Sequence, residues 1–153
     1  MQGNVNTDAE ERAREYLGWL VREYTVFIDT CSWMEQEIEL FARHLIDALD
    51  GTDKAVYLAL SVYNELVKLS QDTERCEKAS RAIFVIRSLK AHGKLILIGD
   101  PGDTFADNIL YSKFSEFRLT MKMALVTQDK ELSREILGLN EIQSSRGLPI
   151  VVC

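Results

Sequence analysis

Residues 25–30, TVFIDT, decide the fold of this chain. The first four are β-branched or aromatic, which favours a short strand, and the strand ends where the chain becomes polar at Asp29. Continuous apolar strands of this kind are typical of a parallel sheet that is covered on both faces. The stretch therefore predicts an α/β protein with an acidic side chain at the carboxyl end of a buried strand.

Further apolar runs alternate with amphipathic segments along the rest of the chain. We expect the other strands at residues 55–60, 95–98, 124–127 and 150–152. The expected helices are at residues 34–49, 73–92, 105–121 and 130–137, and Gly93 directly follows the second of these. A further short helix is expected to begin at Ser61, as its cap, and to continue past Glu65. Because these helices are long enough to cross back over a sheet, we predict a three-layer α/β/α fold with a central parallel sheet of four to five strands.

An amphipathic helix is predicted at about residues 8–22, before the first strand. It starts at a TDAE segment with the form of a capping box. We therefore divide the chain into an N-terminal extension, residues 1–24, and one domain, residues 25–153. The sequence stops at Cys153 within an apolar run, so we expect the chain to be the N-terminal part of a longer protein.

Composition and charge exclude several functional classes. The 153 residues include 18 Lys and Arg against 24 Asp and Glu, so a formal charge of −6 provides no basic field for phosphates or anionic membranes. We expect neither a signal peptide nor a membrane span, because no apolar run approaches about 18 residues. The cysteines Cys31, Cys76 and Cys153 are far apart, which argues against disulfides and structural zinc and fits a cytoplasmic protein.

Acidic residues follow the predicted strands. Asp29 follows the first strand, Glu65 lies one helical turn past the second, Asp107 lies in the first turn after the third, and Asp129 follows the fourth. Ligands of an open parallel sheet bind outside the carboxyl ends of its strands, so we expect these carboxylates at one edge. They repel one another unless a cation lies between them, and hard oxygen ligands suit Mg²⁺ or Mn²⁺. Such a site can hydrolyse a phosphodiester with an activated water.

Four acidic segments resemble the motifs of the PIN domain family, in the same order. They are FIDT at residues 27–30, VYNEL at 62–66, ADNIL at 106–110 and LVTQDKEL at 125–132. The resemblance covers about residues 24–153. Two features depart from the family pattern: Cys31 stands where many relatives have Asn or Ser, and the helix before the first strand is an addition to the minimal fold.

The resemblance implies a metal-dependent ribonuclease, most often an endoribonuclease, as found in toxin-antitoxin pairs and RNA-processing enzymes. The catalytic and metal-binding carboxylates that it implies are Asp29, Glu65, Asp107 and Asp129. By the same resemblance, Thr30 and Thr127 support the site through hydrogen bonds. The implied cofactor is Mg²⁺ or Mn²⁺, and the implied partners are an RNA substrate and an antitoxin-like or other protein. Whether the added helix covers the sheet, pairs two protomers as a homodimer or binds a partner stays open.

Each candidate residue also has a plainer interpretation. Asp29 and Asp129 are suited to cap the helices that follow them, and Glu65 to a solvated helix position. Asp107 competes with Asp100 and Asp103 in the preceding Gly and Pro loop. The alternative functions are a noncatalytic module that binds RNA or a protein, and a structure-specific DNA nuclease. The presence of all four acids favours the enzyme.

Basic and sulfur side chains are further candidates. Cys31 lies beside Asp29, so we expect a small buried residue rather than a nucleophile. No nucleotide-binding fingerprint and no histidine-based triad is present in the sequence. The candidates for a basic approach to an RNA backbone, against the alternative of solvated helix faces, are Lys113, Arg118, Lys122, Lys130 and Arg134.

Overall fold

Five parallel strands form one sheet in the computed structural model, which describes residues 3–99, 113–117, 120–141 and 150–153. The strands are β1 (Thr25–Ile28), β2 (Val56–Ala59), β3 (Leu95–Ile98), β4 (Met123–Val126) and β5 (Ile150–Val152). Their order across the sheet is β3-β2-β1-β4-β5, so β1 is the central strand. The parallel sheet predicted from the sequence is confirmed.

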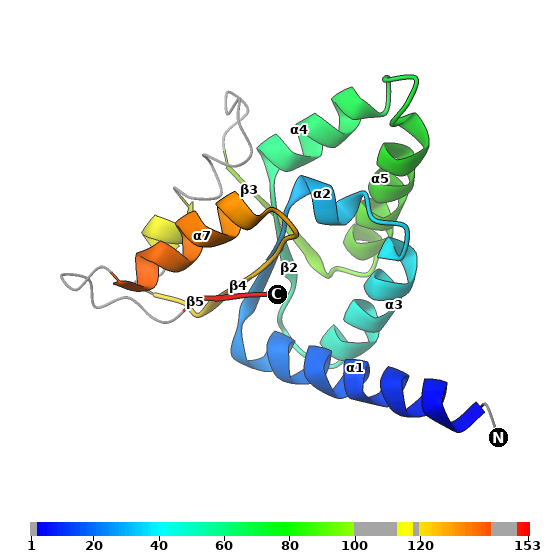
Figure 1. Ribbon diagram of the computed structural model, residues 1–153, viewed down its shortest axis with the longest axis vertical. Coiled ribbons are helices and arrows are strands. Elements are labelled where there is room, and N and C mark those ends of the chain that lie inside the picture. The colour runs from blue at the N-terminus through cyan, green and yellow to red at the C-terminus, as the bar shows by residue number, and fades with distance from the viewer. Residues whose placement is uncertain (1–2, 100–112, 118–119, 142–149) are drawn as a thin grey trace.

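Helices cover both sides of this sheet (Figure 1). One side carries α1 (Gly3–Glu23), α3 (Ile38–Leu49) and α5 (Cys76–Ala91), and the other carries α7 (Lys130–Gly138), which leads into a short 3-10 helix at Leu139–Glu141. Two further helices, α2 (Thr30–Trp33) and α4 (Leu60–Leu69), start at the carboxyl ends of β1 and β2. Residues 113–117 are also helical. The three-layer α/β/α architecture is therefore confirmed, with α1 preceding the first strand.

Three predicted helix starts are wrong. α1 begins at Gly3, so the TDAE segment at residues 7–10 lies inside the helix and does not start it. The helix that we expected at 34–49 begins at Ile38, as α3. Residues 34–37 form a turn after the separate short helix α2, which Asp29 caps directly after β1 and which we did not predict. Ser61 does not cap α4: the chain passes from β2 into α4 without a loop, so Ala59 occupies the cap position and Ser61 lies in the first turn. Gly93 has φ = 70°, the left-handed conformation predicted for a residue just past a helix.

The connections between strands place a crevice beside β1. The chain leaves β1 through α3 toward β2, and it leaves β4 through α7 toward β5 on the opposite side of the sheet. Since β1 and β4 are neighbours, the topological switch point of the sheet lies between their carboxyl ends. Open α/β sheets bind ligands at such switch points, outside the carboxyl ends of the strands.

The hydrophobic core extends from the sheet into α1. Phe27 of β1 and Leu125 of β4 are fully buried, and Leu17, Leu20 and Val21 of α1 belong to the same buried cluster. The helix before the first strand therefore packs as part of the fold. Within the described ranges, no helix is both long and apolar enough to cross a membrane.

Candidate functional site

Asp29 is held in place by both oxygens of its carboxylate. The residue follows β1 directly and is only 3% exposed. Oδ1 accepts a 2.9 Å hydrogen bond from the backbone N–H of Ser32, and Oδ2 accepts one from the hydroxyl of Thr127. The indole Nε1 of Trp33 donates to the carbonyl oxygen of Ile28 at 3.0 Å, which fixes α2 against the end of β1. A buried carboxylate with two fixed hydrogen bonds has a defined orientation.

Thr127 connects the end of β4 to Asp29. The register of the two strands pairs Ile28 with Val126, so the next residue of each strand leaves the sheet at the same level. The Thr127 side chain is buried, and its hydroxyl also accepts a 3.0 Å hydrogen bond from the backbone N–H of Asp129. One threonine hydroxyl thus links two of the predicted acidic residues, and its bond to Asp29 spans 98 positions of sequence.

Asp129 caps α7. Its Oδ1 accepts hydrogen bonds from the backbone N–H groups of Glu131 at 2.9 Å and Leu132 at 3.1 Å. The side chain is half-buried. The capping function considered for Asp129 is therefore present, as it is for Asp29 on α2. Capping uses Oδ1 in both residues and is compatible with a ligand on the remaining lone pairs.

Glu65 reaches the same edge of the sheet through Thr30. It lies on α4, is exposed, and accepts at Oε2 a 2.9 Å hydrogen bond from the hydroxyl of Thr30. Thr30 is the residue after Asp29, so this bond connects the helices that follow β1 and β2. Three of the four predicted acidic residues are thereby connected, Asp129 through its backbone N–H to Thr127 and Glu65 through Thr30, without direct contact between their carboxylates. The fourth, Asp107, lies outside the described residues, as do its competitors Asp100 and Asp103.

Two serines at this edge escaped the sequence prediction. The hydroxyl oxygens of Ser32, in α2, and Ser61, in α4, are buried and have no hydrogen-bond partner among the described residues. A buried hydroxyl is normally satisfied by protein, water or a bound ion, so these oxygens indicate polar ligands at the edge. The only sequence signal was a small hydroxyl residue in the first turn of a helix that follows a strand.

The residues present fit a hard divalent ion in their chemistry. Asp29, Glu65 and Asp129 offer only oxygen donors, which Mg²⁺ and Mn²⁺ prefer. Among the residues that the structure describes, no group of three or more His, Cys, Asp or Glu side chains is arranged to hold a metal ion. Mg²⁺ does not require such a group, because it keeps several waters and binds through one or two carboxylates together with substrate phosphate.

Cys31 differs from its predicted environment. We expected a buried side chain beside Asp29, whereas Cys31 is exposed. The reason is the short helix α2, which turns the neighbouring side chains of Ser32 and Trp33 into the protein and Cys31 outward. The thiol therefore does not belong to the buried part of the site.

Comparison with known proteins provides no assignment. No protein-family model matches the chain, and no curated protein matches it.

Proposed function

We propose that this protein is a cytoplasmic, metal-dependent ribonuclease of the PIN type that hydrolyses RNA phosphodiester bonds with water. The single observation that carries the proposal is the hydrogen-bonded connection of acidic residues from three strand ends. Thr127 links Asp29 to Asp129, and Thr30 links Glu65 to the residue after Asp29. These contacts lie at the switch point of a parallel sheet, where ligands of such folds bind. The order of the acidic motifs in the sequence also supports the proposal.

The residues that would hold the ion are Asp29, Glu65, Asp107 and Asp129. When bound, a divalent ion supplies a more acidic water and neutralises charge on the phosphate and the leaving oxygen. The chain contributes orientation, because Thr127 and the N–H of Ser32 fix the Asp29 carboxylate. Burial of Asp29 at 3% exposure keeps bulk water from its hydrogen bonds.

Substitution of Asp29 tests the proposal. Asp29→Asn is expected to abolish Mg²⁺- and Mn²⁺-dependent cleavage of single-stranded RNA, because the charge that attracts the ion is removed. Asn caps helices about as well as Asp, so α2 is retained and the fold stays intact or becomes more stable as repulsion between carboxylates falls. The measurements are cleavage of a labelled oligoribonucleotide and urea unfolding. Asp129→Asn is expected to behave in the same way.

The matched control is Asp47→Asn, an equal change of charge at an exposed position of α3. It should retain full activity. A titration with Mn²⁺ provides a readout that is independent of activity: an ion at 100 times its Kd stabilises the native state by about 2.7 kcal/mol, and this thermal shift should be lost in Asp29→Asn. Full activity in either site variant would refute the assignment.

A noncatalytic module is the second candidate, and the capping contacts favour it. Asp29 and Asp129 both use Oδ1 to cap a helix, so a structural function already accounts for their positions. On this alternative, Mn²⁺ leaves the thermal stability of the parent protein unchanged and no RNA is cleaved. The same titration therefore decides between the two candidates.

A further inference from the structure

We infer that the groove along α7 binds the phosphodiester backbone of a single-stranded nucleic acid and leads it to the carboxylates at the end of β4. The inference rests on the proposed function, and it identifies the surface that holds the substrate. The groove has a volume of about 620 Å³. Its lining includes Thr127 and Asp129 at the end of β4, and Lys130, Ser133 and Arg134 along α7.

The position of the groove connects it to the candidate site. Its first lining residue, Thr127, donates a hydrogen bond to the carboxylate of Asp29, and Asp129 caps the helix that forms the groove. From there the groove continues along α7 to Gly138. A strand lying in it would therefore have one of its phosphates next to the acidic residues that we propose to hold the ion.

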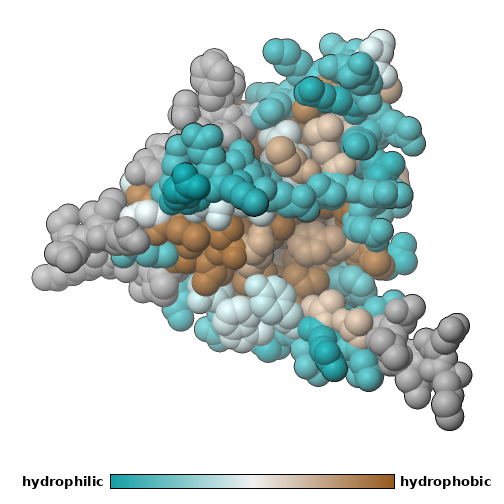
Figure 2. Space-filling view, in the orientation of Figure 1, coloured by the Kyte–Doolittle hydropathy of each residue, from teal (hydrophilic) through white to brown (hydrophobic). Residues whose placement is uncertain are grey.

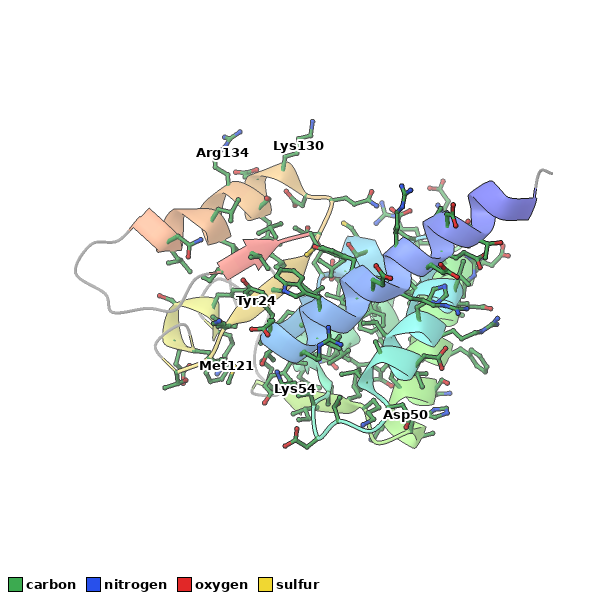
Figure 3. The ribbon with its side chains drawn as sticks, turned by 90° about the horizontal axis from the view of Figure 1, so that it is seen from below. Tyr24, Asp50, Lys54, Met121, Lys130 and Arg134 are labelled. Carbon is green, nitrogen blue, oxygen red and sulfur yellow. The ribbon has the colours of Figure 1, made fainter. Side chains whose placement is uncertain are left out.

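Two cations of α7 point out of the protein at the groove. Lys130 and Arg134 are separated by four residues, so they lie on one face of the helix, about 6 Å apart along its axis. Figure 3 shows both side chains extending away from the body of the molecule on the same side of α7. In the space-filling view, hydrophilic side chains gather over α7 beside an apolar area (Figure 2).

Two of the other basic residues proposed from the sequence are engaged elsewhere, and Arg118 lies outside the described residues. The ammonium group of Lys113 lies 3.5 Å from a carboxylate oxygen of Glu116, and that of Lys122 lies 3.8 Å from one of Glu23. No ion pair is found for Lys130 or Arg134 with any residue that the structure describes. These two cations are therefore available to a ligand at the groove.

The chemistry of the groove favours a phosphate backbone over bases. Its lining contains hydroxyl, amide and cationic groups, the carboxylate of Asp129 at the end next to the candidate site, and one leucine. It contains no aromatic ring, whereas base recognition in single strands depends mainly on aromatic stacking. The protein carries a formal charge of −6, and α7 itself also carries Glu131 and Glu135. Attraction of a polyanion therefore depends on Lys130 and Arg134 lying together on one face of the helix. Contacts to phosphate carry no sequence information, and we therefore expect binding with little sequence preference.

The test compares two double variants that each remove two positive charges. Lys130→Gln/Arg134→Gln changes the groove, and Arg87→Gln/Lys90→Gln changes two exposed cations of α5 near the amino end of β3. Binding of a short single-stranded oligoribonucleotide of mixed sequence is measured by fluorescence anisotropy in EDTA, so neither cleavage nor a bridging ion contributes. The same oligonucleotide as DNA is a second arm.

Loss of two phosphate contacts is expected to reduce the slope of log K against log salt by about 1.4, at about 0.7 per contact on a single strand. The α5 variant should keep the slope of the parent protein. RNA and DNA should be affected alike, because both present the same phosphate. If the double variant does not fold, each single variant should reduce the slope by about 0.7. Equal slopes for the α7 and α5 variants, or absence of binding by the parent protein, as expected for a groove that takes a protein partner, would overturn the inference.

Cleavage assays with Mn²⁺ separate this inference from the proposed function. If the parent protein cleaves RNA and the α7 variant binds and cleaves equally well, the ribonuclease proposal stands and the groove is wrong. If binding depends on α7 and no divalent ion supports cleavage, the groove assignment stands and the ribonuclease proposal is wrong.

Discussion

At the scale of single residues, the side chain of Thr127 has the largest number of structural constraints at the candidate site. Its buried hydroxyl donates one hydrogen bond to Asp29 and accepts another from the N–H of Asp129. No other side chain in the described ranges joins β1, β4 and α7 in this way. The two acidic residues were predictable, because an acid after an apolar strand is visible in the sequence. The threonine contact was expected only from the family resemblance, since it depends on the register of two distant strands.

Replacement of Thr127 by Val is expected to destabilise the protein by about 1–3 kcal/mol. Valine preserves the shape of the side chain but leaves a buried carboxylate oxygen of Asp29 and a backbone N–H without their partner. The measurement is equilibrium unfolding in urea. The control is Thr120→Val, because the hydroxyl of Thr120 is exposed where it donates to the carbonyl of Phe117; its effect should stay within about 0.5 kcal/mol. Equal effects of the two substitutions would contradict a structural function for Thr127.

At the scale of elements, the strands were predicted better than the helices. Residues 95–98 and 150–152 form strands with the expected bounds, because short apolar runs between turn residues leave little choice of conformation. The short helix α2, which precedes the expected helix at 34–49, was not predicted. Periodicity identifies apolar faces, but α2 starts where Asp29 accepts a hydrogen bond from Ser32, and that contact has no periodic signal.

Two glycines at helix ends allow a test of backbone conformation alone. Gly93 follows α5 and has φ = 70°. Gly138 is the last residue of α7, and its φ is not positive. A Cβ added at either position would meet no atom within 4 Å. Gly93→Ala is therefore expected to cost about 1–2 kcal/mol from the left-handed conformation.

Gly138→Ala should instead stabilise the protein by about 0.4–1 kcal/mol, because alanine restricts the unfolded chain. Urea unfolding of both variants gives the comparison. A shift of stability in the same direction for both substitutions would contradict the explanation that Gly93 is needed for its left-handed conformation.

At the scale of the whole molecule, α1 is attached to both the core and the end of the chain. Leu20 is 1% exposed within the main core cluster. One turn before Leu20, the hydroxyl of Tyr16 lies 3.2 Å from the thiol of Cys153. This hydrogen bond, followed by burial, raises the pKa of Tyr16 from 10.0 to about 12. The stability that the contact adds is thus fully present below pH 10 and is lost as pH rises through 12.

Truncation of one leucine in α1 tests whether this helix belongs to the folding unit. Leu20→Ala is expected to destabilise the protein by about 2–5 kcal/mol, since it leaves a cavity in the core. Leu40→Ala, in α3, is the control: this side chain is 44% exposed, and its loss should change stability by less than about 0.5 kcal/mol. If urea unfolding shows the same small loss of stability for Leu20→Ala and Leu40→Ala, α1 does not belong to the cooperative folding unit.

The pairing of β1 with β4 determines when this protein becomes complete during its synthesis. Asp29 emerges early, but the residue that orients it, Thr127, lies 98 positions later. Contacts between such distant positions form late, because the intervening chain must first be ordered. For most of translation, the growing polypeptide therefore carries β1 without its partner β4, and Asp29 without the hydrogen bond from Thr127. Both are completed only when the last quarter of the chain has left the ribosome.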